Sequence, residues 1–180
     1  MDKLVPTLVV AAVLVVALLL IVWGWRRRVR RDRPAGGGYA ARTDARGEAP
    51  AQPIASAESF YVATTKGGEH LERLALPGLS FRGKATVSVA ADGVTIAVTG
   101  EQPVYIPVSA ISGFGTATTA IDRVVEKDGL LRLSWTTSGG AAADSFFRVV
   151  DPADRAPIVG AVESILPAGS QAGTSTESEV

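Results

Sequence analysis

The feature that most constrains this chain is an uncharged apolar run near its N-terminus, residues 5–25. At 1.5 Å per residue, a helix of that length spans about 31 Å, which matches the roughly 30 Å hydrocarbon core of a bilayer. No polar stripe divides the run, so it lacks the pattern of an amphipathic helix packed on a soluble domain. Pro6 falls in the first turn, where a missing N–H is tolerated. The sequence therefore predicts a transmembrane helix at 5–25, preceded by a short extracytoplasmic N-terminus at 1–4.

A cleaved signal peptide is the rival interpretation of the same run. Such a peptide has a basic start, a shorter apolar stretch and small residues at its cleavage site. Here only Lys3 precedes the run as a basic side chain, and the run ends in Trp-Gly-Trp followed by arginines. We therefore expect an uncleaved signal anchor that crosses the membrane once.

A basic juxtamembrane segment, residues 26–33, predicts the orientation of the anchor. It carries six arginines and a single acid, Asp32, so the positive-inside rule places it and everything after it in the cytoplasm. We expect the N-terminus outside and the location to be the plasma membrane. The arginines can also contact anionic lipid head groups, at about 1 kcal/mol each. The side chains predicted at the membrane interface are Trp23, Trp25, Arg26, Arg27, Arg28, Arg30, Arg31 and Arg33.

Two segments have a composition that is typical of chain outside a folded core. Residues 34–57 are rich in Ala, Gly and Pro with scattered charge, and they predict a flexible linker. A linker of about 25 residues has a root-mean-square reach of about 25–30 Å. Residues 167–180 are similar and predict a disordered tail; its last residues could dock in a PDZ-type groove, but a plain solubilising tail is favoured.

The remaining residues, 58–166, predict a mostly-β domain. Apolar and polar side chains alternate over residues 84–98, and Asp92-Gly93 in the middle is typical of a hairpin turn. Asp128-Gly129 predicts a second hairpin, between strands at 121–126 and 130–135. Similar patterns predict about seven strands in all, among them one at 72–76, with a turn or short helix at 108–111.

The last element of the domain changes period and predicts a helix at about 152–166. Asp151 is suited to the N-cap and Pro152 to the first helical position. Apolar residues then recur at helical spacing from Ile158 to Leu166, so one face of the helix must cover the sheet.

Seven short strands followed by one capping helix resemble the pleckstrin-homology-like (PH-like) barrel. The chain resembles in particular the actinobacterial single-pass membrane proteins with a bacterial PH-like domain, sometimes labelled export or transporter proteins. The residues that carry the resemblance are Tyr61-Val62-Ala63-Thr64-Thr65, Leu79-Ser80-Phe81-Arg82-Gly83, Asp92-Gly93, Ile106-Pro107 and Phe147-Arg148. The resemblance implies the fold and a bacterial source, and it transfers no activity, because one fold hosts many functions.

Composition excludes several chemistries. The chain has no cysteine and one histidine, His70, which predicts no thiolate nucleophile, no Cys-ligated zinc, no cofactor and no metal site. Residues 60–166 carry nine basic and eleven acidic side chains, a balance that argues against nucleic-acid binding. Trp135, Phe146 and Phe147 sit in strand patterns typical of core packing. No catalytic motif is present, and we expect no enzymatic activity.

Four basic side chains are the candidates for contacts between the domain and lipid head groups. They are Lys66, Arg73, Arg82 and Lys84. Glu69 and Glu72 lie in the same stretch and oppose a phosphate site. The favoured function is therefore a membrane-tethered, non-enzymatic binding or scaffold module with a protein partner. The alternatives are an anionic-lipid sensor and an accessory subunit of a transport or export complex. No pattern in the sequence indicates an oligomeric state.

Overall fold

A computed structural model describes residues 4–39, 52–117, 119–120, 123–124 and 129–166. The chain divides into two compact units, Met1–Pro34 and Ala35–Val180. In the first unit, helix α1 (Leu4–Asp32) is followed by the 3-10 turn η1 (Arg33–Ala35). By length and composition, α1 could cross a membrane. Its most apolar stretch of 18 residues has a mean hydropathy of 2.9, and no residue of that stretch is buried. The helix runs beyond 25 through the arginines, which are good helix formers.

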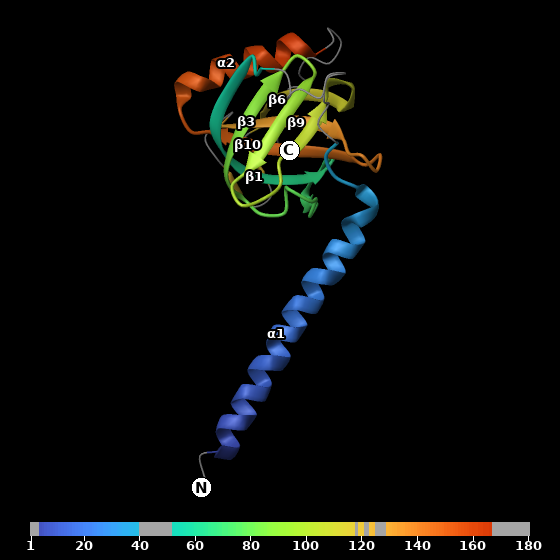
Figure 1. Cartoon of the computed structure of the whole chain (residues 1–180), viewed down its shortest axis with the longest axis vertical. Helices are drawn as coiled ribbons and strands as arrows, with labels where there is room; N and C mark the ends of the chain where they lie inside the picture. Colours follow the sequence, from blue (N-terminus) through green and yellow to red (C-terminus); the bar gives the residue numbers. More distant parts are fainter. Residues whose placement is uncertain (1–3, 40–51, 118, 121–122, 125–128, 167–180) are drawn as a thin grey trace, which may run out of the picture. The chain divides into compact units, whose positions relative to one another are not determined.

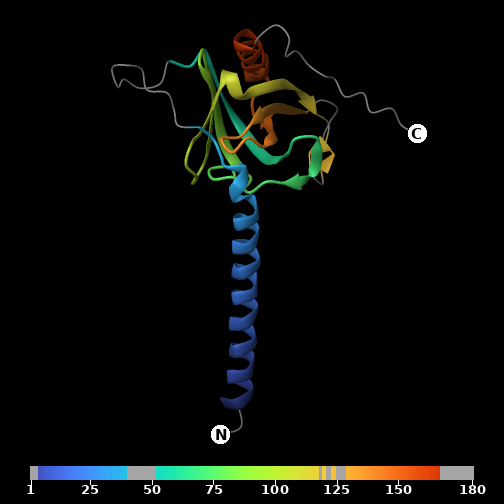
Figure 2. The same ribbon diagram turned by 90° about the vertical axis from the view of Figure 1, so that its right-hand side faces the viewer.

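The second unit is built on antiparallel strands (Figures 1 and 2). The strands are β1 (Ala55–Lys66), β2 (Glu69–Arg73), β3 (Gly83–Ala90), β4 (Gly93–Val98), β5 (Val104–Pro107), β6 (Ile111–Ala117), β7 (Thr119–Ala120), β8 (Arg123–Val124), β9 (Leu130–Thr136) and β10 (Ala142–Val149). The main sheet has the order β5-β4-β3-β1-β10-β9-β6, with β2 paired to β1. A 3-10 turn, η2 (Val108–Ala110), joins β5 to β6, as the sequence predicts for 108–111.

Strand β1 is long because it serves both halves of the sheet. Residues Ala55 to Tyr61 pair with β3, and Ser59 to Lys66 pair with β10. The register shifts between Tyr61 and Ala63, and a bulge of this kind bends a strand and increases its twist. The bend lets the sheet curl around one core, as Figure 1 shows. The mainly β domain expected from the sequence is confirmed.

Helix α2 (Pro152–Ile165) covers one end of the curled sheet (Figures 1 and 2). The Asp151 carboxylate caps it by accepting a hydrogen bond from the Ala153 N–H at 2.9 Å, and Pro152 occupies the first position. Ile158, Ala161 and Val162 are buried on its inner face. The capping helix expected from the change of period is confirmed.

The core is one cluster shared by the sheet and α2. Its largest fully buried side chains include Trp135, Tyr61, Leu133 and Ile96. Phe147 belongs to this cluster, whereas Phe146 points to the other face of β10 and packs with Leu130 in a second, small cluster. The three aromatic side chains predicted for the core are thus buried, Trp135 and Phe147 in the large cluster and Phe146 in the small one.

The first predicted hairpin turn is displaced by one residue. Ala90 pairs with Gly93, so the turn residues are Ala91 and Asp92, and Gly93 is the first residue of β4. Glycine is required at 93 for another reason: a Cβ there would lie 2.3 Å from the Ile106 carbonyl oxygen on β5. The β5 strand therefore passes too close for any side chain. Of the second predicted hairpin, Asp128 and most of 121–126 lie outside the described residues.

The predicted flexible linker at 34–57 differs from the structure at both ends. Residues 35–39 are hydrogen-bonded to the domain, and Ala55 to Ala57 belong to β1 rather than to the linker. Small residues such as these alanines occur in linkers too, so their composition alone does not show that they form a strand. Residues 40–51 lie outside the described part of the chain. The strand predicted at 72–76 is found instead as β2 at 69–73.

Candidate functional site

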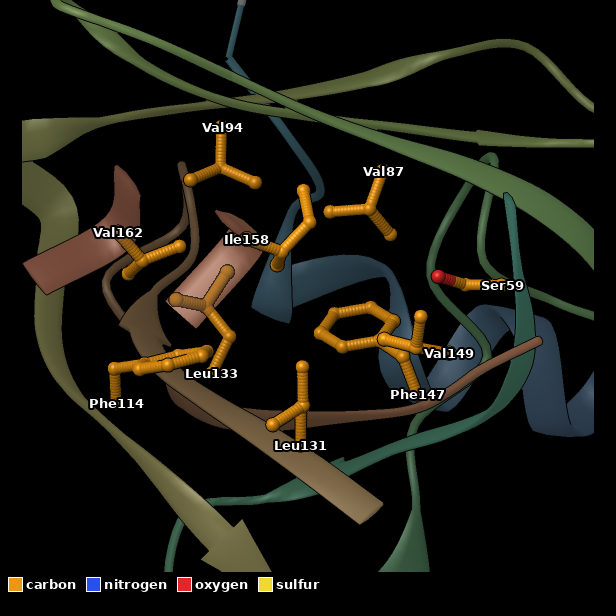
Figure 3. A pocket seen from close by; sticks show the side chains of 10 residues that line it. All are labelled: Ser59, Val87, Val94, Phe114, Leu131, Leu133, Phe147, Val149, Ile158 and Val162. Atoms are coloured by element: carbon orange, nitrogen blue, oxygen red, sulfur yellow. The ribbon is translucent and has the colours of Figure 1, made fainter. Parts of the chain in front are cut away.

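The interior of the domain holds a small cavity between the sheet and α2 (Figure 3). Its volume is about 10 Å³. One water needs about that much space and two or more polar partners. The lining side chains are Ser59, Val87, Val94, Phe114, Leu131, Leu133, Phe147, Val149, Ile158 and Val162. Ser59 is the one polar side chain among them, so this cavity is too small and too apolar to hold a ligand.

Ser59 is 2% exposed, and its Oγ has no hydrogen-bond partner. An unpaired buried hydroxyl destabilises the fold, whereas a paired one supports it. We therefore predict that Ser59→Ala leaves the free energy of unfolding unchanged or raises it by about 1 kcal/mol. Ser145→Ala is the matched control, because Ser145 is also buried but accepts from the Trp135 indole at 2.9 Å; it should cost about 1–3 kcal/mol. Urea unfolding of both variants measures the two free energies. Equal losses of stability would contradict the conclusion that the Ser59 hydroxyl is unpaired and the Ser145 hydroxyl is paired.

Ser145 belongs to a buried chain of hydrogen bonds that ties three strands together. Its Oγ lies 2.8 Å from Thr64 Oγ1, and the Tyr61 hydroxyl lies 2.9 Å from the same Thr64 oxygen and 3.0 Å from the Leu79 carbonyl oxygen. Burial raises the pKa of Tyr61 to about 12. Because every group has a partner inside the core and none faces solvent, this chain of bonds stabilises the barrel rather than forming a reactive site.

A hollow of about 320 Å³ lies on the outer surface, beside β9 and β10. The Asp144 carboxylate is its buried charge, with one oxygen accepting from Ser134 Oγ at 2.5 Å and the other from the Gly68 N–H at 3.2 Å. Arg132 also lines the hollow. Asp144 thus links the turn between β1 and β2, through Gly68, to strand β9, through Ser134. In the part of the chain that the structure describes, no three His, Cys, Asp or Glu side chains gather to hold a metal ion.

The side chains predicted for a membrane interface follow one another at the C-terminal end of α1 and in η1. Trp23 and Trp25 are 62% and 54% exposed. The Arg27 guanidinium lies 5.8 Å from the centre of the Trp23 ring, a cation–π contact between side chains on the same face of the helix. The assignment of Trp23, Trp25 and the arginines to an interface stays a prediction.

The four candidate head-group contacts do not form one basic cluster. Lys66 Nζ lies 2.6 Å from Glu69 Oε1 and 3.8 Å from Glu72 Oε2, and its hydrogen bond lowers the pKa of Glu69. Arg73 donates to the Ser80 carbonyl oxygen at 3.1 Å. Two of the four candidates are therefore engaged with this chain's own groups.

Arg82 and Lys84, the other two candidates, are exposed. Arg82 stands just before β3, and Lys84 lies within it, opposite Phe60 of β1. Phe60 and Phe81 are themselves 41% and 59% exposed. Exposed basic and aromatic side chains thus share this side of the domain. Their role in head-group binding stays a prediction.

Residues 35–39, here called the strap, form the feature that sequence reasoning missed. The Tyr39 N–H donates to the Tyr105 carbonyl oxygen of β5 at 2.8 Å, and its hydroxyl donates to the Thr136 and Thr137 carbonyl oxygens at 2.7 and 3.1 Å. Gly37 exchanges two bonds with Ser138, from its N–H to Ser138 Oγ at 3.0 Å and from the Ser138 N–H to its carbonyl at 2.9 Å. The strap therefore joins β5 to the turn after β9.

Three consecutive glycines make the strap possible. Gly36 has φ +74°, and a Cβ on it would lie 2.5 Å from the Gly139 nitrogen. A Cβ on Gly38 would lie 2.4 Å from Val104 Cγ1. Gly-Gly-Gly-Tyr is usually a sign of flexible chain. Here the glycines let the backbone of the strap lie close to the domain. The aromatic residue that follows them, Tyr39, was the one sign in the sequence that this segment binds to the domain.

The described domain is a curled antiparallel sheet with a packed core, a capping helix and a hollow on its outer surface. That architecture fits a PH-like domain. The chain belongs to the bacterial PH domain-like family, whose model matches residues 40–163. PH-like domains are generally non-catalytic binding modules. The strap lies outside the matched residues.

Other comparisons add little to this assignment. No curated protein matches the chain. A chain in the solved structure of the 8S snRNP assembly intermediate is similar over 69% of this chain and 87% of its own length, with 10% identity and a TM-score of 0.42. So remote a likeness carries no functional argument.

Proposed function

We propose that the protein is a membrane-tethered, non-enzymatic PH-like binding module that lies at the cytoplasmic face of the plasma membrane. The observation that carries the proposal is the pairing of an apolar helix, α1, none of whose apolar window is buried, with a domain whose interior is filled. An exposed apolar helix of this length requires a lipid environment. A filled barrel leaves only its outer surface for a partner.

The orientation is supported by the charge at the two ends of α1. Arginines crowd its C-terminal end and continue into η1, whereas Lys3 is the one basic side chain before it. Under the positive-inside rule the PH-like domain is cytoplasmic, where a binding module can recruit or hold a soluble or membrane protein. An accessory role in a transport or export complex is one form of this function, because one helix cannot form a transport path alone.

The absence of native cysteine allows a direct test of sidedness. Single-cysteine variants Lys3→Cys and Ser175→Cys are treated in intact cells with a membrane-impermeant maleimide. We expect labelling at position 3 in intact cells, and labelling at position 175 only after lysis or in inverted vesicles. Labelling of 175 in intact cells would overturn the orientation, and recovery of the chain in the soluble fraction would overturn the anchor.

Binding itself is tested with a promiscuous biotin ligase fused to the C-terminus of the full chain. We expect a reproducible set of biotinylated membrane-associated proteins that is lost when α1 is replaced by an unrelated transmembrane helix facing outward. The same labelling pattern from a ligase fused to an unrelated membrane anchor would contradict a specific partner.

A further inference from the structure

We propose that the hollow beside β9 and β10 is a binding site for a free α-amino acid, whose ammonium group bonds to Asp144 and whose carboxylate bonds to Arg132. Both side chains line this hollow of about 320 Å³. Sites for small ligands begin at about 300 Å³, so the hollow has room for a molecule of this size. The inference goes beyond the proposed function and does not depend on the membrane anchor, because every residue that lines the hollow belongs to the domain.

The hollow lies beside a position of β6 that carries no side chain. Gly113 of β6 pairs with Ser134 of β9, and a Cβ on Gly113 would lie 3.7 Å from Ser134 Cβ. A larger residue at 113 would therefore occupy the space beside Ser134. The register of β6 also shifts between Ile111 and Gly113, and such a shift can re-aim a side chain. The residue at the shift, Ser112, is exposed and lines the hollow.

Asp144 is a buried carboxylate without an ion pair. It is 5% exposed, and its oxygens accept from Ser134 Oγ at 2.5 Å and from the Gly68 N–H at 3.2 Å. Both donors are neutral, and in the described part of the chain no Lys or Arg side chain forms an ion pair with Asp144. A buried charge without an opposite charge is unfavourable. Because a carboxylate has about four lone-pair sites, Asp144 can accept further bonds from an ammonium group.

A second buried polar group lies next to this carboxylate. Thr65 of β1 pairs with Asp144 of β10, and paired residues of antiparallel strands point to the same face of the sheet. Thr65 is 0% exposed, and its Oγ1 has no hydrogen-bond partner among the described residues. An unpaired buried hydroxyl destabilises the fold unless a ligand or an ordered water bonds to it. This face of β1 and β10 therefore has hydrogen-bonding capacity that the described residues leave unused.

Arg132 brings the opposite charge to the same hollow. It lies two residues from Ser134 along β9, so both side chains point to the same face, and Ser134 pairs with Asp144. Arg132 and Asp144 are therefore diagonal neighbours on adjacent strands, a relation in which Cβ atoms lie about 7–8 Å apart. A guanidinium has several N–H donors in a planar fork, so Arg132 can donate to a ligand carboxylate while it keeps its other contacts.

The two charges together select the chemical class of the ligand. A simple amine would be repelled by Arg132, and a simple carboxylate would be repelled by Asp144. An α-amino acid carries an ammonium and a carboxylate one carbon apart, so each group meets its opposite charge when the molecule lies between the two side chains. Hydrogen bonds between charged groups are stronger than those between neutral ones. The hollow is therefore matched to a zwitterion rather than to an ion of one sign.

The test uses the full chain in nanodiscs and saturation-transfer difference NMR, with the L-α-amino acids added one at a time and empty nanodiscs as the blank. We expect at least one amino acid to bind. Its decarboxylated amine and its deaminated acid are then titrated in the same way, and each should bind about 10-fold or more weakly, because each lacks one charged group. If no amino acid binds, or if the amine or the acid binds as tightly as the parent, the proposal is overturned.

Two charge variants locate the binding in the hollow. Asp144→Asn and Arg132→Gln should each weaken binding of the amino acid by about 10- to 100-fold, because each removes one charged partner. Glu163→Gln and Arg148→Gln are the matched controls, since both side chains are exposed and neither lines the hollow. The controls should leave the Kd unchanged. Equal weakening by a charge variant and its control would overturn the site.

Gly113→Leu keeps the test decisive if a charge variant does not fold, as judged by near-UV circular dichroism. A Cβ at 113 meets only atoms of Ser134, at 3.7 and 3.9 Å, which is ordinary contact, so this variant should fold. The added side chain fills space in the hollow without changing its charges, and it should abolish binding of the amino acid. A folded Gly113→Leu that keeps the wild-type Kd would show that the amino acid binds elsewhere and would overturn the proposal.

Discussion

Gly93→Val should prevent the domain from folding, or lower its free energy of unfolding by more than about 3 kcal/mol. Its Cβ would lie 2.3 Å from the Ile106 carbonyl oxygen and 2.9 Å from Pro107 Cα. Both are backbone atoms of the β5 region, so no side-chain rotation relieves the overlap. β5 would have to separate from β4, which exposes Val94 and Ile106 from the core. Urea unfolding of the full chain in detergent micelles, followed by near-UV circular dichroism, measures the loss.

Gly115→Val is the matched control for this change. Gly115 also lies in a strand, β6, but a Cβ there has no atom within 4 Å. Valine favours strands over glycine, so the control should keep the wild-type free energy of unfolding or exceed it slightly. If Gly93→Val unfolds at the same urea concentration as Gly115→Val, the close passage of β5 is not what requires glycine at 93.

Alkaline pH should destabilise the domain through Tyr61. Its pKa is raised from 10.0 to about 12 because burial disfavours the charged phenolate. Above pH 10 the unfolded chain loses this proton while the folded chain keeps it, so stability is fully present below pH 10 and falls as the pH rises toward 12. A shift of two pKa units corresponds to about 2.7 kcal/mol of stability lost through this one group.

Tyr61→Phe isolates that contribution from the titration of other groups. The variant should be about 1 kcal/mol less stable at pH 8, because its hydrogen bonds to Thr64 and Leu79 are gone. Its free energy of unfolding should then fall less steeply than that of the wild type between pH 10 and 12. Parallel pH profiles for the two proteins would show that Tyr61 is not held protonated by the fold.

The elements that were predicted from the sequence are those with a local pattern. The apolar length of α1, the alternation around β3 and β4, and the change of period at α2 each depend on side chains close together in the chain. The resemblance to a PH-like barrel rested on their order, and the family match over residues 40–163 confirms it. The turn before β4 was missed by one residue because an Asp-Gly pair also occurs where glycine is needed for packing.

The strap shows why the candidate surface could not be predicted in full. Gly36 to Gly38 and Tyr39 have the composition of a linker, and the groups that bind them, such as Ser138 and the Tyr105 carbonyl, are distant in sequence. Likewise, Lys66 was a head-group candidate until its distances to Glu69 and Glu72 were known. Backbone bonds between remote segments leave no periodic trace in either segment.

The sequence by itself determined the apolar helix, its charged flank, the order of strands and helix, and the absence of cysteine chemistry. These properties follow from length, charge and period, which are local. Only the tertiary structure decided that the cavity beside α2 is small, and that residues 35–39 are hydrogen-bonded to the domain. It also decided that β5 passes too close to residue 93 for any side chain other than that of glycine. Each of those depends on the distance between atoms far apart in the chain, which composition does not specify.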